Sequence, residues 1–229
     1  MNGINFIQPL FHAVVEGRKT MTRRVMKPQP DDNGLHDHTK FPMSDHPSYD
    51  REGFWGTVEE TGESKQFKPR YKVGETLYLK EPYKIELCEG KYKVFFDYSK
   101  NVIDLPQSVS PEGILKVQNS MRKSKSGYCN KLFVVKGLPE YFPYRIEITG
   151  VKAEKLQNIS DGDCLKEGIQ EERPEYYDLP KNSKPNYYHY GKEWHKTTQQ
   201  AFAALIDKIK RGTWDSNPFV FCYEFKLVK

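Results

Sequence analysis

Long hydrophobic runs and paired cysteines are both missing from this 229-residue chain. No apolar stretch approaches the ~20 residues that cross a bilayer, and the first residues do not form a signal peptide, so we expect a cytoplasmic protein with no membrane partner. The four cysteines are scattered, without a C-x-x-C pair or a histidine in ligand spacing. We therefore expect reduced thiols, no metal site, no disulfide framework and no cofactor.

A strong overall charge is also missing. The 36 Lys and Arg against 31 Asp and Glu leave a formal charge of only +5, which is weak evidence for a nucleic-acid partner unless the cations cluster. The 15 Tyr and 13 Phe, by contrast, argue against general disorder. The length allows one large domain or two small ones with a substantial core.

The cations do cluster, in the sequence GRKTMTRR at residues 17–24. Apolar residues from 4 to 15 mix strand and helix spacing, which predicts a strand followed by a short helix that ends at Gly17 in the left-handed region. The basic turn 17–24 would then lead into a strand from Thr22 to Val25. Four cations there repel one another unless an anionic ligand or acidic side chains face them. The alternative is a solvated basic edge.

The rest of the chain predicts short strands and few helices. Alternation predicts strands near 54–58 and over 144–156, and a hairpin over 76–98. Helices are expected at 160–168, with Ser160 as its N-cap and Gly168 at its end, and at 197–210. A closing strand is expected over 219–227. Polar or weakly patterned stretches fill 27–70, 99–140 and 170–194, and together these elements predict an α+β barrel in one domain.

The order of these motifs resembles the ASCH domain of the PUA-like superfold, in particular its longer phage and prophage members. The matching residues are Gly17 to Val25, Lys27-Pro28, Val73-Gly74-Glu75, Lys80-Glu81, Tyr144-Arg145-Ile146, Leu156 to Ser160, Glu167-Gly168-Ile169, Trp214, Asn217-Pro218 and Glu224-Phe225. The resemblance implies a single domain over 1–229, a small β-barrel with two or three peripheral helices. Insertions at about 31–70, 99–140 and 170–195 lie outside the minimal domain.

The resemblance also implies a module that binds RNA or a modified nucleoside or nucleotide. Its cleft would be lined by the basic turn 17–24 and Glu167. The expected ligand-binding residues are Arg18, Thr20, Arg23, Arg24 and Arg145.

An alternative is an amidohydrolase, because a subset of small bacterial ASCH proteins hydrolyses the amide of N4-acetylcytidine. The matching catalytic residues here are Lys19, Thr22 and Glu167. Thr22 would be the nucleophile and a neutral Lys19 its base, since neighbouring cations and burial lower a lysine pKa. Against this, the chain adds roughly a hundred residues in loops to the near-minimal barrel of those enzymes. A second alternative is a phage-derived structural or interaction protein, and the oligomeric state is not predicted.

Aromatic residues in the insertions offer a further surface. Trp55, Tyr187, Tyr188, Tyr190 and Trp194 suit base stacking, or else local packing.

Overall fold

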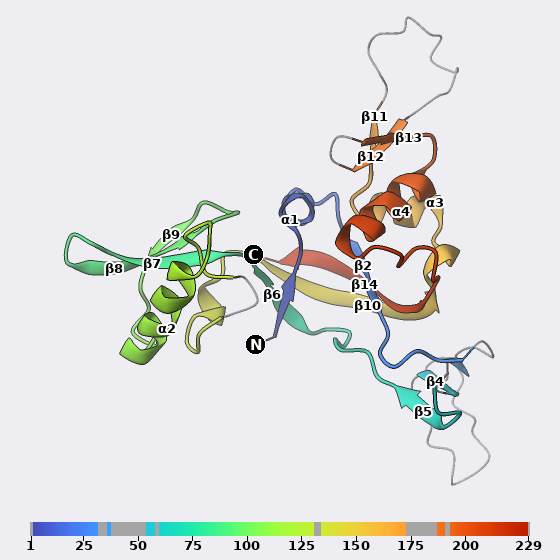
Figure 1. Ribbon diagram of the computed structural model, residues 1–229, viewed down its shortest axis with the longest axis horizontal. Coiled ribbons are helices and arrows are strands. Elements are labelled where there is room, and N and C mark those ends of the chain that lie inside the picture. Colours follow the sequence, from blue (N-terminus) through green and yellow to red (C-terminus); the bar gives the residue numbers. More distant parts are fainter. Residues whose placement is uncertain are drawn as a thin grey trace, which may run out of the picture. The chain divides into compact units, whose positions relative to one another are not determined.

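Two compact units, interleaved along the chain, make up the computed structural model (Figure 1). The structure describes residues 2–31, 36–37, 54–57, 60–130, 134–172, 187–190 and 193–228. Unit 1 consists of residues 1–17, 74–148 and 226–229, and unit 2 of residues 18–73 and 149–225. The two strands β10 and β14 continue from one unit into the other. That the whole chain is one domain stays a prediction.

Unit 1 joins three strands of a mixed sheet to a small antiparallel sheet. Its elements are β1 (Gly3–Asn5), α1 (Gln8–Val15), β6 (Thr76–Lys80), β7 (Tyr83–Cys88), β8 (Lys91–Phe96), β9 (Val102–Asp104), α2 (Pro111–Arg122) and the first part of β10 (Arg145–Lys155), with a short 3-10 helix at Pro139–Tyr141. Strand β6 pairs with β1 in parallel and with β10 antiparallel. Strands β7, β8 and β9 pair in order, and α2 packs on β7. The buried core between them includes Tyr83, Phe96, Val117 and Phe142.

Two predictions in unit 1 were wrong in detail. The hairpin is narrower than residues 76–98: it consists of β7 and β8, with its turn at Glu89 and Gly90, whose φ angles are both positive. The chain leaves the β6 sheet at Glu81 and Pro82, because proline has no N–H for a ladder. The stretch 99–140 is not only loop, since it contains β9 and the helix α2. Ser110 caps α2 by accepting a hydrogen bond from the Gly113 N–H (3.2 Å).

The described part of unit 2 contains two α-helices and the strands on which they pack. Its elements are β2 (Met21–Val25), β3 (His36–Asp37), β4 (Phe54–Thr57), β5 (Ser64–Phe67), the rest of β10, a 3-10 helix at Leu156–Asn158, α3 (Asp161–Lys166), β11 (Gln170–Glu172), β12 (Tyr187–Tyr190), β13 (Glu193–His195), α4 (Thr198–Ile209) and β14 (Phe219–Val228). The order in its main sheet is β10-β14-β2, with β14 antiparallel to β2. Helices α3 and α4 lie side by side (Figure 1).

The strong local patterns of unit 2 are confirmed: the short strand β2, the long strand β10, the capped helix α3, the helix α4 and the closing strand β14 all form. Gly17, at the end of unit 1's first segment, is left-handed as expected, with φ 77°. The insertions at 31–70 and 170–195 were expected to be mainly loop. Their described parts include two three-stranded sheets, β3-β4-β5 and β11-β12-β13, and much of both insertions lies outside the described residues.

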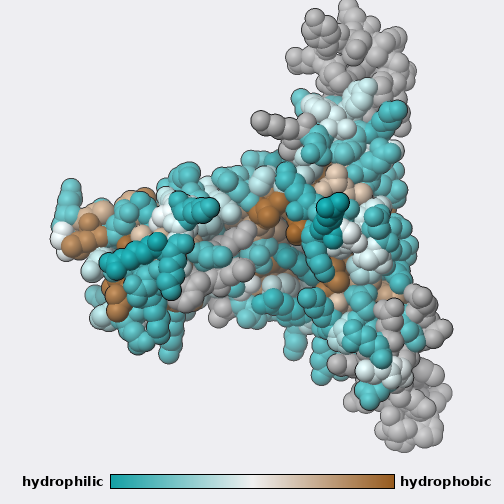
Figure 2. Space-filling view, viewed as in Figure 1, coloured by the Kyte–Doolittle hydropathy of each residue, from teal (hydrophilic) through white to brown (hydrophobic). Residues whose placement is uncertain are grey.

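The fold class is therefore α+β, as predicted, with open sheets and no closed barrel among the described strands. The face shown in Figure 2 is largely hydrophilic, in keeping with the 29% of charged residues in the chain. None of the described helices is long and apolar enough to cross a bilayer. All four cysteines are free thiols.

Candidate functional site

The two faces of strand β2, which contains the second half of the basic turn 17–24, carry chemically different side chains. Successive side chains of a strand point to opposite sides of the sheet. Arg23 therefore shares a face with Met21 and with Cys222, its partner on β14. Thr22 and Arg24 point the other way, together with Tyr223 and Phe221 opposite them on β14. All of these residues belong to unit 2.

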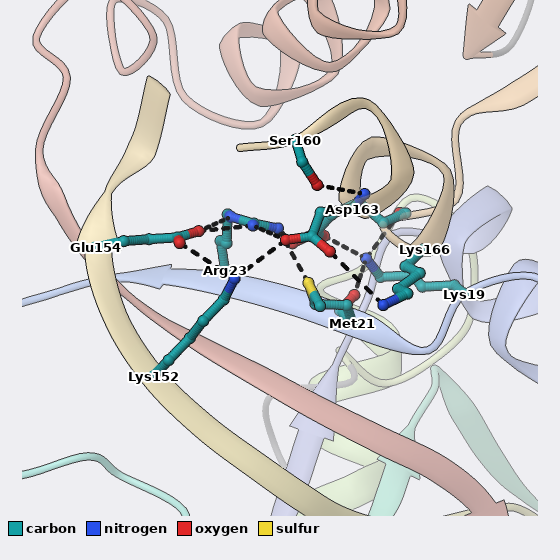
Figure 3. A network of polar contacts seen from close by, with 9 residues as sticks. Lys19, Met21, Arg23, Lys152, Glu154, Ser160, Asp163 and Lys166 are labelled. Carbon is teal, nitrogen blue, oxygen red and sulfur yellow. Dashed lines mark hydrogen bonds and ion pairs between the residues drawn. The ribbon is translucent and has the colours of Figure 1, made fainter. Parts of the chain in front are cut away.

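Arg23 is the centre of a buried ion network on the first face (Figure 3). Its Nη2 donates to Glu154 Oε1 (2.6 Å) and to Asp163 Oδ2 (2.9 Å), and its Nη1 donates to Glu167 Oε1 (3.1 Å). Its Nε also donates to Glu154 Oε1 (2.9 Å). A planar guanidinium with five N–H donors is suited to contacting several carboxylates at once. Arg23 thus joins β2 to β10 and α3.

Lys19 completes the network from the turn before β2. Its Nζ donates to Glu167 Oε2 (2.6 Å), to the Glu167 carbonyl oxygen (2.8 Å) and to the Met21 carbonyl oxygen (2.7 Å). Lys19 is only 2% exposed and Glu167 only 3%. An ammonium has three N–H donors, so these three oxygens match its full donor capacity. Each carboxylate oxygen of Glu167 therefore contacts one cation of the basic turn.

Helix α3 presents the acids of this network because of its local sequence. The Asp163 N–H donates to Ser160 Oγ (3.1 Å), which fixes the first turn. Asp163 and Glu167 are four residues apart and so lie on the same side of the helical turn. The helix ends at Lys166 with Glu167 as its C-cap, and Gly168 follows in the left-handed region with φ 100°. The Thr20 N–H donates to the Lys166 carbonyl oxygen (2.9 Å), which ties the helix end to the basic turn.

Burial and ion pairing shift the pKa values in the network. Burial lowers the pKa of the Lys19 ammonium, and the contact with Glu167 opposes this effect without cancelling it. Burial also disfavours the Arg23 cation, but the carboxylates of Glu167 and Glu154 outweigh it and raise the Arg23 pKa. Burial alone would raise the pKa of the Asp163 carboxyl, but hydrogen bonds from Lys152 and Arg23 lower it.

The second face of β2 carries a cation among aromatic rings. Arg24 is partly exposed and lies opposite Phe221 in the strand register. Tyr223 stacks edge-to-face on Tyr71, with ring centroids 5.3 Å apart, and its hydroxyl accepts a hydrogen bond from the Arg70 N–H (2.9 Å). Burial lowers the pKa of Arg24, and the nearby Tyr71 and Glu167 oppose this effect without cancelling it, while the Arg70 cation acts in the same direction as burial.

A cavity of about 510 Å³ lies farther along unit 2, beyond the end of β2. Its lining residues are Met26, Lys27, Pro28, Gln66, Phe67, Lys68 and Phe221. Arg24 and Met26 are two residues apart, so the strand that carries Arg24 on its aromatic face leads directly into this cavity.

The structure brings together only part of the predicted catalytic set. Lys19 and Glu167 meet, and Arg23 joins them. Thr22 is buried on the opposite face of β2, and within the described part of the chain no hydrogen bond joins its hydroxyl to Lys19 or Glu167. The strand alternation at β2 separates the two. The catalytic role of all three residues stays a prediction.

The predicted ligand-binding residues are also distributed. Arg18 is exposed and Arg24 partly exposed, whereas Arg23 is buried among acids. Thr20 contributes through its backbone, which contacts Lys166 and Phe225. Arg145 belongs to unit 1, where its guanidinium donates to the Glu140 carbonyl oxygen.

The charged residues of the network that were not predicted as site residues are Lys152, Glu154, Asp163 and Lys166. The i, i+4 spacing of Asp163 and Glu167 on one predicted helix was a usable signal for a pair of acids facing the basic turn. No local sequence feature indicated that Lys152 and Glu154 belong to a site, because both simply alternate with apolar residues on a long strand.

The described aromatic residues of the 170–195 insertion contact one another. Trp194 packs edge-to-face on Tyr187 and lies tilted over His189, with ring centroids 6.3 and 4.7 Å apart. Tyr190 is buried, and Trp194 is half exposed. The packing alternative therefore accounts for most of this cluster, and the Trp55 side chain lies outside the described residues.

No protein-family model, curated protein or solved structure matches the chain. The likeness to the ASCH domain therefore rests on the sequence motifs alone.

Proposed function

We propose that unit 2 binds a nucleotide or a single-stranded RNA element, as a PUA-like module of the ASCH type. The observation that supports this most directly is the division of the basic turn into two pairs of cations. Lys19 and Arg23 are buried against acids, whereas Arg18 and Arg24 are exposed or partly exposed. Phosphate groups bind to exposed cations, and bases bind to the aromatic faces beside them.

The aromatic face of β2 supplies both kinds of contact in one place. Arg70 is close enough to Arg24 to act against the Arg24 charge, and the rings of Tyr71, Tyr223 and Phe221 lie around Arg24. The buried network on the other face then has a positioning role, because it fixes β2 against α3 and β10. Glu167 holds the turn in this proposal and does not contact the ligand.

Binding of a labelled single-stranded oligoribonucleotide, measured by fluorescence anisotropy over a range of salt concentrations, tests the proposal. Arg24→Ala should weaken binding to all sequences and reduce the slope of log K against log salt by about 1 for each lost phosphate contact. Arg122→Ala, an exposed arginine at the end of α2 in unit 1, is the matched control. An Arg24→Ala variant that binds as tightly as the wild type, or a wild type that does not bind, would overturn the proposal.

A second candidate, hydrolysis of an acylated nucleoside, is supported by the contact between Lys19 and Glu167. Burial lowers the Lys19 pKa, as a lysine base requires, whereas the 2.6 Å ion pair with Glu167 favours the protonated ammonium and acts in the opposite direction. The position of Thr22 on the other face of β2 counts against it. Incubation with N4-acetylcytidine, with cytidine detected by chromatography, is the test. Turnover that survives Lys19→Ala would remove this mechanism.

A further inference from the structure

The 510 Å³ cavity of unit 2 is built partly by a segment outside the minimal ASCH pattern. Residues 26–28 follow β2, Phe221 is on β14, and residues 66–68 come from β5 and its end. Strand β5 belongs to the 31–70 insertion. One wall of the cavity is therefore formed by the predicted insertion.

The lining of the cavity is apolar on its floor and cationic at its rim. Met26, Phe67 and Phe221 are all buried, and Phe54 packs edge-to-face on Phe221 with ring centroids 5.5 Å apart. Lys27 and Lys68 are exposed, and none of the seven lining residues within the described part of the chain is an acid. This combination suits a ligand with a planar apolar ring and an anionic group.

Hydrogen bonds hold the walls in place without a ligand. The Gln29 side chain donates to the carbonyl oxygens of Met26 (2.8 Å) and Phe219 (3.2 Å), and it accepts from the Phe219 N–H (2.8 Å). The segment after β5 is tied to β14 by the Arg70 N–H and the Tyr223 hydroxyl. Preorganised walls reduce the entropy that a ligand would otherwise lose by ordering them.

We propose that this cavity is a one-nucleotide subsite: the base lies against Phe67 and Phe221, and Lys27 and Lys68 hold the phosphate. Cavities of roughly 300–1,000 Å³ hold small ligands, so the observed volume suits a nucleoside monophosphate. Phe221, which lies opposite Arg24 in the strand register, lines the cavity, and this places the subsite at the end of the binding face. The inference rests on the proposed function and names the nucleotide site within it.

Calorimetric titration with AMP, CMP, GMP and UMP, with the corresponding nucleosides and with inorganic phosphate, tests the subsite. At least one nucleotide should bind more tightly than both its nucleoside and phosphate, because base and phosphate each contribute. Lys68→Glu should weaken that binding by at least about tenfold, the loss expected for a charge-assisted hydrogen bond. Lys91→Glu reverses an exposed lysine of β8 in unit 1 and should bind like the wild type. Equal melting temperatures would show that the variants fold.

The outcomes separate the subsite from the broader proposal. Nucleotide binding that is unchanged in Lys27→Glu and Lys68→Glu, or phosphate that binds as tightly as any nucleotide, would overturn the subsite. If RNA binding is lost in Arg24→Ala but nucleotides do not bind, only the subsite fails. If nucleotides bind as described while no RNA binds, the subsite holds and the proposed function narrows to free nucleotides. Absence of both kinds of binding would overturn both proposals.

Discussion

At the scale of single residues, the contact between Lys19 and Glu167 shows how a carboxylate offsets the repulsion between the cations of the basic turn. Both side chains are almost completely buried, and the carboxylate also contacts Arg23. Removing one partner of a buried ion pair leaves an uncompensated charge, whereas removing both is less costly. The two residues should therefore be strongly coupled in stability.

A double-mutant cycle measures this coupling. Lys19→Met should lower the free energy of unfolding by about 3 kcal/mol, because Glu167 would keep only one buried cation. The double variant with Glu167→Gln should lose less than the sum of the single variants, by at least about 1 kcal/mol. Urea denaturation of the four proteins gives the values. The exposed pair of Lys116 and Glu112 on α2 is the control and should show no measurable coupling. Additive effects for Lys19 and Glu167 would contradict this account.

At the scale of secondary-structure elements, helix α3 depends on its N-cap. It has only six residues, and the Ser160 hydroxyl accepts the Asp163 N–H. Ser160→Ala should lower the free energy of unfolding by about 1 kcal/mol, and Ser160→Thr should restore most of it, since a threonine hydroxyl also caps helices. Thermal or urea denaturation checks both variants. If threonine destabilises as much as alanine, the hydroxyl is not the cause.

The elements with strong local signals could be predicted from the sequence. Ser160, Gly168 and the apolar spacing of α4 mark helix ends and faces within a few residues, and β10 and β14 are long enough for alternation to show. Strands such as β3 and β11 have only two or three residues, too few for a pattern. Helix α2 was missed although Ser110 and Pro111 form a usual helix start, because few apolar residues follow them.

The ion network could be predicted only in part, for a different reason. Its contacts join residues that are far apart in the chain: Arg23 is 131 residues from Glu154 and 140 from Asp163. The pairing of β14 with β2, together with the strand order β10-β14-β2, brings these side chains together. The motif resemblance pointed to Lys19 and Glu167. Alternation along β2 places Thr22 on the face opposite Arg23, and the contact of Arg23 with Glu167 on α3, which the sequence did not specify, shows that Glu167 lies on the Arg23 side.

At the scale of the whole molecule, the interleaving of the two units has a consequence for unfolding. The chain passes between the units at residues 17/18, 73/74, 148/149 and 225/226, so neither unit is one continuous segment. The last two crossings fall inside β10 and β14. Disordering one unit would break a continuous strand of the other, so we expect both units to unfold in one cooperative transition.

The positions of the tryptophans make this expectation testable. All three tryptophans, at 55, 194 and 214, belong to unit 2, so tryptophan fluorescence reports on that unit alone, while far-ultraviolet circular dichroism reports on both. Ser110→Ala removes the cap of α2 in unit 1, at a cost of about 1 kcal/mol. It should lower the midpoint of the fluorescence transition by about 2–4 °C and that of the dichroism transition equally. A fluorescence midpoint that stays fixed while the dichroism signal splits into two steps would show that the units unfold separately, despite sharing β10 and β14.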